Sequence, residues 1–183
     1  MLNITGDSKV SQEIGSGTGS GVDFSREWVL FPHRSLILEI PDTIVPRPIG
    51  NTNPHVGLPF DAEENAWIAA FNPTQNRTAN ELETFKDEWF TNHKKLVPTR
   101  LAEIMTINGQ TAFIQEARSD TGGQNTLAFV YADGEIYVFQ YHAADRFFEA
   151  YHPYFIRMME SIKEKKQMQQ ANSKVDSEQN LEV

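Results

Sequence analysis

The chain has 183 residues, 39% hydrophobic and 11% aromatic, which suits one domain with a sizeable core. Its formal net charge of −9 at pH 7 excludes the basic footprint that nucleic-acid binding needs. The absence of cysteine excludes disulfides, thiol catalysis, cysteine-ligated zinc and iron–sulfur clusters, and no apolar run is long enough to predict a membrane span.

The two ends differ in composition from the middle. Glycines alternate with Ser and Thr in "SQEIGSGTGSG", so residues 1–25 are predicted to be a flexible tether. The polar residues 166–183 predict a disordered tail, which leaves one domain over residues 26–165. No signal peptide follows Met1, so the protein is either cytoplasmic or exported with its signal outside this chain. A Gly/Ser arm before a domain favours export, as a secreted or membrane-anchored protein.

The first predicted elements are strands. Two apolar runs, residues 27–31 and 36–40, flank the loop "PHRS" and predict a hairpin. Residues 41–65 contain several X-Pro steps without a periodic pattern, so they predict a long irregular connection. "AWIAAF", residues 66–71, predicts a third strand.

A helix is predicted next, over residues 79–96. Thr78 and Glu81 have the spacing of a capping box. Apolar residues then recur at helical spacing, at Leu82, Phe85, Trp89 and Leu96. Acidic residues come early and Lys94 and Lys95 late, which complements the helix dipole, and Pro98 ends the pattern.

Two hairpins follow, each with a dipeptide that suits a type I′ turn. Asn108-Gly109 and Asp133-Gly134 separate runs that are rich in β-branched and aromatic residues. Residues 103–141 are therefore predicted to form a four-stranded antiparallel meander, whose halves are joined by the loop 119–123. Both faces of the second hairpin are apolar: Leu127, Phe129, Tyr131, Ile136 and Val138 on one, Ala128, Val130, Tyr137, Phe139 and Tyr141 on the other. This hairpin therefore needs cover on both sides.

The closing helix is predicted over residues 151–165. Its apolar stripe consists of Phe147, Tyr151, Tyr154, Met158 and Ile162, widened by Phe148, Phe155 and Met159. Pro153 is placed in the first turn, where its missing N–H costs nothing, and residues 143–150 form an entry turn. This stripe is interpreted as a packing face rather than a cofactor site.

Three features of residues 26–163 are similar to those of one known family: the order of elements, the "NGQTAF" and "DGEIYVF" hairpins, and the closing "Y-x-x-Y-F-x-x-M-M-x-S-I" helix. In these features the chain resembles the PsbP-like family. The resemblance implies an α/β fold in which a central antiparallel sheet is covered by helices on both faces, an α/β/α sandwich. It also implies an accessory or binding protein rather than an enzyme, and an extracytoplasmic lipoprotein. It transfers no functional residues, because the matched positions are structural.

Sites for chemistry are weakly indicated. The sequence shows no nucleophile elbow and no close histidine pair, so no catalytic residue, cofactor site or metal site is predicted. The best cation candidates are the acidic residues Asp61, Glu63 and Glu64, whose oxygens suit Ca²⁺, although a solvated loop is the better explanation of this cluster. His142 and His152 would share a metal only if the final strand meets the start of the helix.

Three functions remain open. The first is a non-catalytic domain that binds another protein chiefly through residues 42–65; the contacts expected there are Arg47, His55, Leu58 and Phe60. The alternative for that segment is that Ile49, Val56 and Phe60 plug one end of the fold. The second function is a carrier of an apolar small molecule, with a pocket between sheet and helix lined by Trp67 and Trp89. The third is a hydrolase with a dispersed site.

Overall fold

The computed structural model describes residues 27–49, 55–60, 63, 65–107 and 109–168. The predicted tether 1–25 and residues 169–183 of the predicted tail lie outside this part of the chain. The elements are β1 (Trp28–His33), β2 (Leu36–Pro41), β3 (Arg47–Ile49), β4 (His55–Pro59), β5 (Ala66–Ala70), the 3₁₀-helix η1 (Ala79–Glu81), α1 (Leu82–Asn92), β6 (Leu96–Pro98), β7 (Glu103–Ile107), β8 (Gln110–Ser119), β9 (Gln124–Ala132), β10 (Glu135–Ala143), α2 (Asp145–Glu160) and β11 (Lys163–Glu164).

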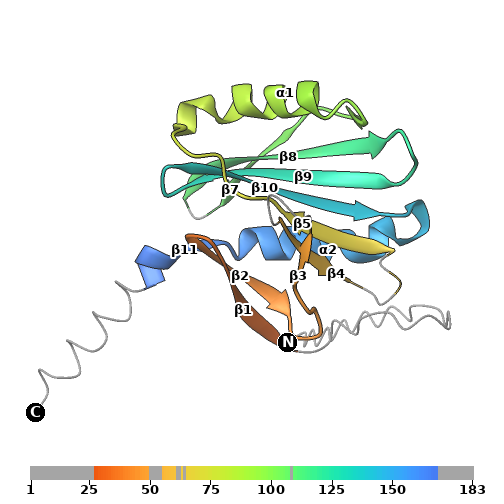
Figure 1. Ribbon diagram of the computed structural model, residues 1–183, viewed down its shortest axis with the longest axis horizontal. Coiled ribbons are helices and arrows are strands. Elements are labelled where there is room, and N and C mark those ends of the chain that lie inside the picture. The colour runs from red at the N-terminus through yellow and green to blue at the C-terminus, as the bar shows by residue number, and fades with distance from the viewer. Residues whose placement is uncertain (1–26, 50–54, 61–62, 64, 108, 169–183) are drawn as a thin grey trace, which may run out of the picture.

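The strands form two sheets (Figure 1). The large one has eight strands, seven of them in the order β3-β4-β5-β10-β9-β8-β6. The eighth, β7, also pairs with β8: β7 pairs with residues 110–114 of that strand and β6 with residues 117–119. The small one has the order β1-β2-β11. Every pairing is antiparallel, which confirms the prediction of a mixed α/β domain around an antiparallel sheet.

The centre of the large sheet is the predicted meander, β7 to β10. Asp133 and Gly134 turn the second hairpin with φ of 50° and 79°, as a type I′ turn requires. The register is the predicted one, with Val130 opposite Tyr137. The strong local turn signal therefore sets which side chains share a face.

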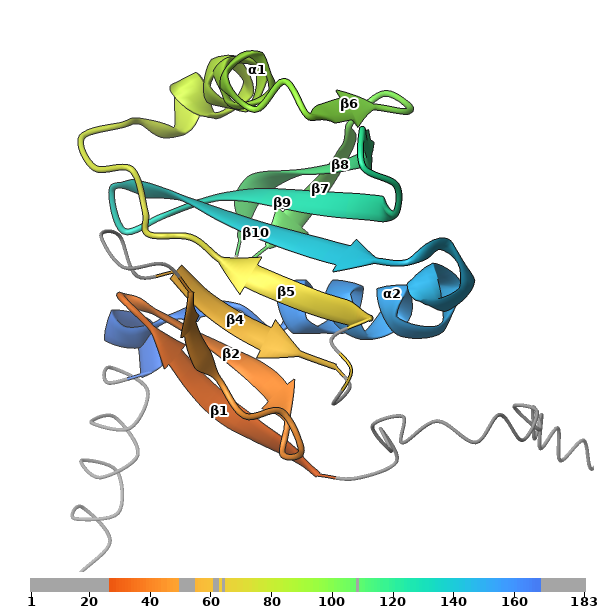
Figure 2. The same cartoon turned by 45° about the vertical axis from the view of Figure 1, so that its right-hand side comes forward.

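Alternate residues of the meander supply two separate hydrophobic clusters. The first cluster joins Val130, Phe139 and Tyr141 to α2 and to the apolar face of β2. The second joins Phe129 and Val138 to Leu82 and Phe85 of α1, among others. The β1–β2 hairpin lies on the side of the molecule away from α1 (Figure 2). In the part of the chain that the structure describes, no helix has the length and apolar character needed to cross a membrane.

The predicted N-terminal hairpin is confirmed, with a turn shorter than expected. β1 and β2 pair from Trp28–Pro41 to His33–Leu36, so only Arg34 and Ser35 form the turn. Arg34 has a φ of 55°. β11 then pairs the other side of β2, which places the end of the domain beside its beginning.

The prediction that residues 41–65 form an irregular connection is wrong in part. β3 and β4 form an antiparallel pair in this segment, and β4 pairs with β5. Prolines 48 and 59 lie within these strands, and β3 is an edge strand, where a missing N–H costs little. Both strands are short and contain a proline, which is unfavourable inside a sheet, so the sequence pattern did not indicate them.

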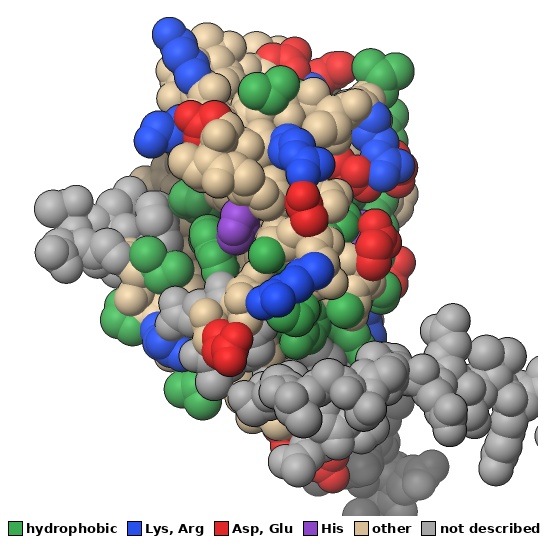
Figure 3. Space-filling model, turned by 90° about the vertical axis from the view of Figure 1, so that its right-hand side faces the viewer, with side chains coloured by type: hydrophobic (Ala, Val, Ile, Leu, Met, Phe, Trp, Pro, Cys, Tyr) green, Lys and Arg blue, Asp and Glu red, His purple; other side chains and the backbone are tan. Residues whose placement is uncertain are grey.

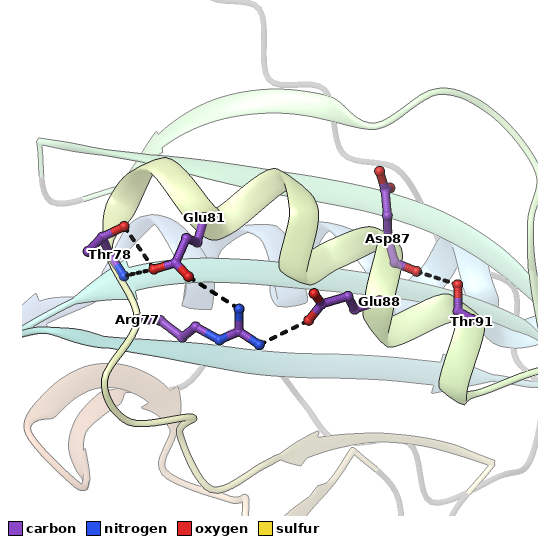
Figure 4. A network of polar contacts seen from close by, with 6 residues as sticks. All are labelled: Arg77, Thr78, Glu81, Asp87, Glu88 and Thr91. Atoms are coloured by element: carbon purple, nitrogen blue, oxygen red, sulfur yellow. Dashed lines mark hydrogen bonds and ion pairs between the residues drawn. The ribbon is translucent and has the colours of Figure 1, made fainter.

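The first helix begins where predicted but ends earlier. The Thr78 N–H and hydroxyl both donate to Glu81, at 2.8 and 2.9 Å, as Figure 4 shows. Arg77 bridges the Glu81 and Glu88 carboxylates, at 3.3 and 3.0 Å, and holds the first turns together. The helix stops at Asn92 rather than at residue 96, because Leu96–Pro98 pairs with β8 as β6. Strand pairing here overrides helical spacing.

The closing helix begins six residues earlier than predicted. α2 starts at Asp145, so Pro153 lies inside the helix and not in its first turn. The carbonyl that loses its hydrogen bond is that of Glu149, four residues before the proline. Both residues are exposed, so water can bond that carbonyl and the cost is tolerated. Phe148, Tyr151, Phe155, Met158 and Met159 are buried, which confirms the packing interpretation of the stripe.

Candidate functional site

The segment predicted to bind a partner divides between surface and core. Arg47 is exposed in β3, and His55 opens β4. Leu58 and Phe60 are fully buried; Phe60 stacks on Tyr151 of α2 at 5.3 Å between ring centroids. Leu58 and Phe60 therefore belong to the core and cannot offer side chains to a partner, as the plug interpretation expected of Phe60.

The exposed part of this segment forms a shallow apolar pocket with β5. Arg47, Ile49, Gly57, Leu58, Pro59 and Trp67 line a volume of 320 Å³, although the Leu58 side chain itself is buried. A Cβ at Gly57 would lie 2.5 Å from the Ile49 Cδ1 atom, so a larger residue there would displace the exposed Ile49 side chain. Hydrophobic side chains also lie beside basic and acidic ones on the side of the molecule where β10 ends (Figure 3).

The predicted cation candidates do not gain support. Glu63 is exposed and accepts a hydrogen bond from the Asn65 amide at 3.0 Å, whereas Asp61 and Glu64 lie outside the described residues. Among the described residues, no three His, Asp or Glu side chains are placed to hold a metal ion.

His142 and His152 do not meet. His142 follows Tyr141 in β10, so it points to the opposite face, where its ring lies 5.3 Å from Trp67 and Nδ1 is 3.2 Å from the Asn125 side-chain oxygen. His152 lies on α2 beside Tyr141, with 6.0 Å between ring centroids. The sheet separates the two histidines, which excludes a shared metal.

A groove that the sequence did not predict lies between α2 and strands β7 and β8. We call it the α2–β7 groove; it has a volume of 430 Å³ and is lined by Arg100, Leu101, Glu103, Met105, Ile114, Glu116, Phe148, Glu149, His152 and Ile156. Phe148, His152 and Ile156 share one face of α2 because they are four residues apart. Glu103, Ile114 and Glu116 share the facing side of the sheet, since Glu103 pairs with Ile114.

The polar groups of this groove are held in place. The Arg100 guanidinium makes a two-point ion pair with the Glu116 carboxylate, at 2.8 and 2.5 Å. The backbone carbonyl of Arg100 accepts a 2.6 Å hydrogen bond from the side-chain amide of Gln115. Glu103 lies 3.9 Å from the same guanidinium. Burial lowers the pKa of His152, so its ring is neutral at pH 7.

A second unpredicted feature is the outer edge of the large sheet. Residues 96–107, which we call the β6–β7 edge, carry three exposed large hydrophobic side chains: Val97 (58% exposed), Leu101 (91%) and Ile104 (72%). Among the described strands, β7 pairs with β8 alone, so its other side carries free backbone N–H and carbonyl groups. Sequence reasoning missed this edge because apolar residues in a predicted strand are expected to face the core, and the sequence does not show which of them remain exposed.

The pocket predicted for an apolar carrier is not the one observed. Trp89 packs against Phe71 and Phe129, at 4.9 and 6.3 Å between ring centroids, so it fills the second cluster. Trp67 lines the shallow pocket on the outer face of β5. The space between sheet and helix is instead the α2–β7 groove, whose ten lining residues include four charged side chains.

Comparison with known proteins identifies the fold. No protein-family model and no curated protein sequence matches the chain. Among solved structures, the chain is similar to cyanobacterial PsbP (CyanoP) from Synechocystis sp. PCC 6803, with a TM-score of 0.58, 13% identity, and coverage of 82% of this chain and 98% of that one. It is also similar to LpqN, involved in cell envelope biogenesis of Mycobacterium tuberculosis, with a TM-score of 0.48, 15% identity and coverage of 75% and 90%. The fold is PsbP-like, as the sequence predicted.

Proposed function

We propose that this chain is a non-catalytic accessory domain that binds another protein, within an exported, membrane-anchored bacterial protein. The observation that carries the proposal is the β6–β7 edge, where Val97, Leu101 and Ile104 are exposed within eight residues. Large apolar side chains that are exposed close together in sequence, beside an open strand edge, suit an interaction site.

The geometry of this edge suits an extended partner segment. β7 offers its free backbone groups to an added strand, and Leu101 and Ile104 offer apolar contact beside it. Neither side chain contributes to the two hydrophobic clusters, so their exposure has no structural use within the domain. A partner that covers them gains apolar burial without disturbing the core.

A binding role is favoured over catalysis by the state of the titratable groups in the α2–β7 groove. Within the described residues, the buried Nε2 atom of His152 has no hydrogen-bond partner, so no carboxylate orients it as a general base. The PsbP-like fold supports an accessory role through the resemblance stated above. Export is supported by the Gly/Ser-rich composition of residues 15–21, and fractionation of source cells that express the full-length gene tests it.

A second surface competes with the β6–β7 edge. The pocket around Ile49 and Trp67 lies in the segment predicted from the sequence, and Val45 and Ile49 are 68% and 41% exposed there. Arg47 at its rim adds a positive charge. If the partner binds at this pocket, the same protein-binding function acts through β3 to β5.

Site-specific photo-crosslinking in the source bacterium separates these surfaces. A photo-reactive amino acid replaces Ile104, Ile49 or, as a control on the exposed side of α1, Glu83. We expect a discrete crosslinked partner from position 104 and none from position 83. Crosslinks from position 49 alone would move the site to the second surface, and equal labelling at all three positions would reject a specific partner.

A further inference from the structure

The β6–β7 edge presents the backbone groups of two particular residues, Ile104 and Thr106. Ile107 pairs with Gln110 across a two-residue connection, so these two form a hydrogen-bonded pair. Hydrogen-bonded and non-hydrogen-bonded pairs alternate along an antiparallel ladder, so Met105 also bonds to β8. The N–H and carbonyl groups of Ile104 and Thr106 therefore point away from β8, to the side where no described strand pairs with them.

The neighbouring strand β6 lacks such donors. The Thr99 N–H donates to the Glu116 carbonyl at 3.0 Å, which sets the alternation at this end of β8. The outer side of β6 then carries the backbone groups of Leu96 and Pro98. The Leu96 N–H donates to the His93 carbonyl at 2.9 Å, and Pro98 has no N–H. Among the described residues of this edge, an added strand therefore finds donors along β7 and not along β6.

The two faces of β7 differ in chemistry. Ile104 pairs with Phe113, which borders the second hydrophobic cluster, so Ile104 lies on the α1 side of the sheet. Glu103 and Met105 lie on the other side, where both line the α2–β7 groove. The side chains of an added strand alternate in the same way. The residue opposite Ile104 meets an apolar side chain that is 72% exposed, and its two neighbours face the groove.

The groove favours a particular charge in one of those neighbours. Arg100 is engaged in a two-point ion pair with another lining carboxylate, and Glu103 meets the same guanidinium only at 3.9 Å. Glu149, on the α2 wall, has no ion pair among the described residues. A basic side chain opposite Glu103 supplies the missing positive charge, whereas an acidic one faces like charges. The residue opposite Met105 lies beside Ile156 as well, which suits an apolar side chain.

We propose that the partner adds an antiparallel strand to β7, with a large apolar residue opposite Ile104, a basic residue opposite Glu103 and an apolar residue opposite Met105. Antiparallel addition lets Ile104 exchange two hydrogen bonds with a single residue. This inference rests on the proposed partner-binding function and names the chemistry of the partner. The β6–β7 edge and the α2–β7 groove are then two parts of one site. The net charge of −9 also favours encounter with a basic segment.

NMR titration of the ¹⁵N-labelled protein with a blocked peptide, Thr-Thr-Val-Leu-Arg-Thr-Thr, tests the strand. In the antiparallel direction its leucine lies opposite Ile104, its arginine opposite Glu103 and its valine opposite Met105. We expect saturable shifts of the Ile104 and Thr106 amides. Methylation of the leucine nitrogen removes the donor that points at β7 and should weaken binding at least about tenfold. Methylation of the arginine nitrogen, which points away from β7, should leave binding unchanged.

Charge exchange tests the register. Glu103→Lys should weaken binding of this peptide about three- to fivefold, as for an exposed ion pair, and should restore binding when glutamate replaces the arginine of the peptide. Glu83→Lys, on the exposed side of α1, is the control and should change neither.

Several results would overturn the inference: no peptide binding, equal effects of the two methylations, or equal effects of the two lysine variants. Shifts of the Ile104 and Thr106 amides that depend on protein concentration without peptide would identify a second copy of the chain as the occupant instead. A partner crosslinked from position 104 in cells, together with any of these results, would leave the proposed function standing and reject only this strand and its register.

Discussion

The hydroxyl of Tyr141 donates a 2.9 Å hydrogen bond to the backbone carbonyl of Phe148. This bond ties the end of β10 to the first half of α2 inside the core, where Tyr141 is fully buried. Burial raises the pKa of Tyr141, so the phenol stays protonated and remains a donor over the working pH range. The helix is thereby fixed over the sheet at the level of the α2–β7 groove.

Tyr141→Phe is expected to lower the free energy of unfolding by about 1 kcal/mol, because it deletes this bond and keeps the ring packing. Urea denaturation measures the loss. Tyr131→Phe is the control, since Tyr131 is only partly buried, and its change should stay within about 0.5 kcal/mol. Equal losses in the two variants would show that the bond to Phe148 adds nothing.

Phe155→Ala should cost about 3–5 kcal/mol through the cavity that it leaves, because Phe155 is fully buried and stacks on Tyr141 at 5.6 Å between ring centroids. Phe147→Ala on the same helix removes a partly buried ring and should cost less. Chemical denaturation of both variants gives the comparison. A loss below about 1 kcal/mol for Phe155→Ala would mean that α2 is not docked on the sheet as described.

Gly122 and Gly123 in the loop between β8 and β9 offer a matched test of backbone strain and steric conflict. Both have positive φ, 95° and 84°, but a Cβ at Gly122 meets nothing within 4 Å. A Cβ at Gly123 would lie 2.7 Å from the His142 Cε1 atom and 3.0 Å from the Ala143 carbonyl. We expect Gly122→Ala to cost about 1–2 kcal/mol and Gly123→Ala at least about 1 kcal/mol more. Thermal unfolding compares them, and equal costs would contradict the close approach of His142.

Stability should fall as the pH is lowered below about 6.5, the ordinary histidine value. Burial lowers the pKa of His142 and of His152; for His152, Arg100 acts in the same direction while Glu116, Glu149 and Glu103 oppose it. The unfolded chain therefore binds more protons than the folded one in this window, so stability is lost as pH falls towards the folded pKa values.

Urea midpoints between about pH 5 and 8 measure this dependence. NMR titration of the two imidazoles gives the folded pKa values directly. His142→Gln should reduce the pH dependence, because it removes one of the two buried rings whose pKa is lowered. Stability that is constant over this range would contradict the predicted burial of both rings in their neutral form.

Sequence reasoning succeeded where a local signal decides the structure. Asp133-Gly134 fixes one turn, and its register then assigns every residue of β9 and β10 to a face. The capping box at Thr78 likewise marks the start of the first helical segment. In each case residues within a few positions determine the conformation.

It failed where pairing across the sheet decides. β3 and β4 are short strands that contain prolines, so their sequence pattern did not indicate strands. Leu96 has the spacing of a helical residue but pairs with Ser119, 23 residues further along the chain. The α2–β7 groove could not be predicted for the same reason. Its two walls come from residues 100–116 and 148–156, and only the docking of α2 brings them together. No spacing within either segment signals a site.

The position of β2 between β1 and β11 sets a condition on how the protein is made. The Glu39 backbone N–H donates a hydrogen bond to the Ser161 hydroxyl at 2.8 Å, and the Lys165 N–H donates to the Ser35 carbonyl at 2.9 Å, so the last residues of the domain close on its first hairpin. The ribosome delivers that hairpin first and its closing strand last. Until β11 has been synthesised, the edge of β2 opposite β1 lacks its partner strand, so the small sheet cannot be complete before residues 163–164 are available.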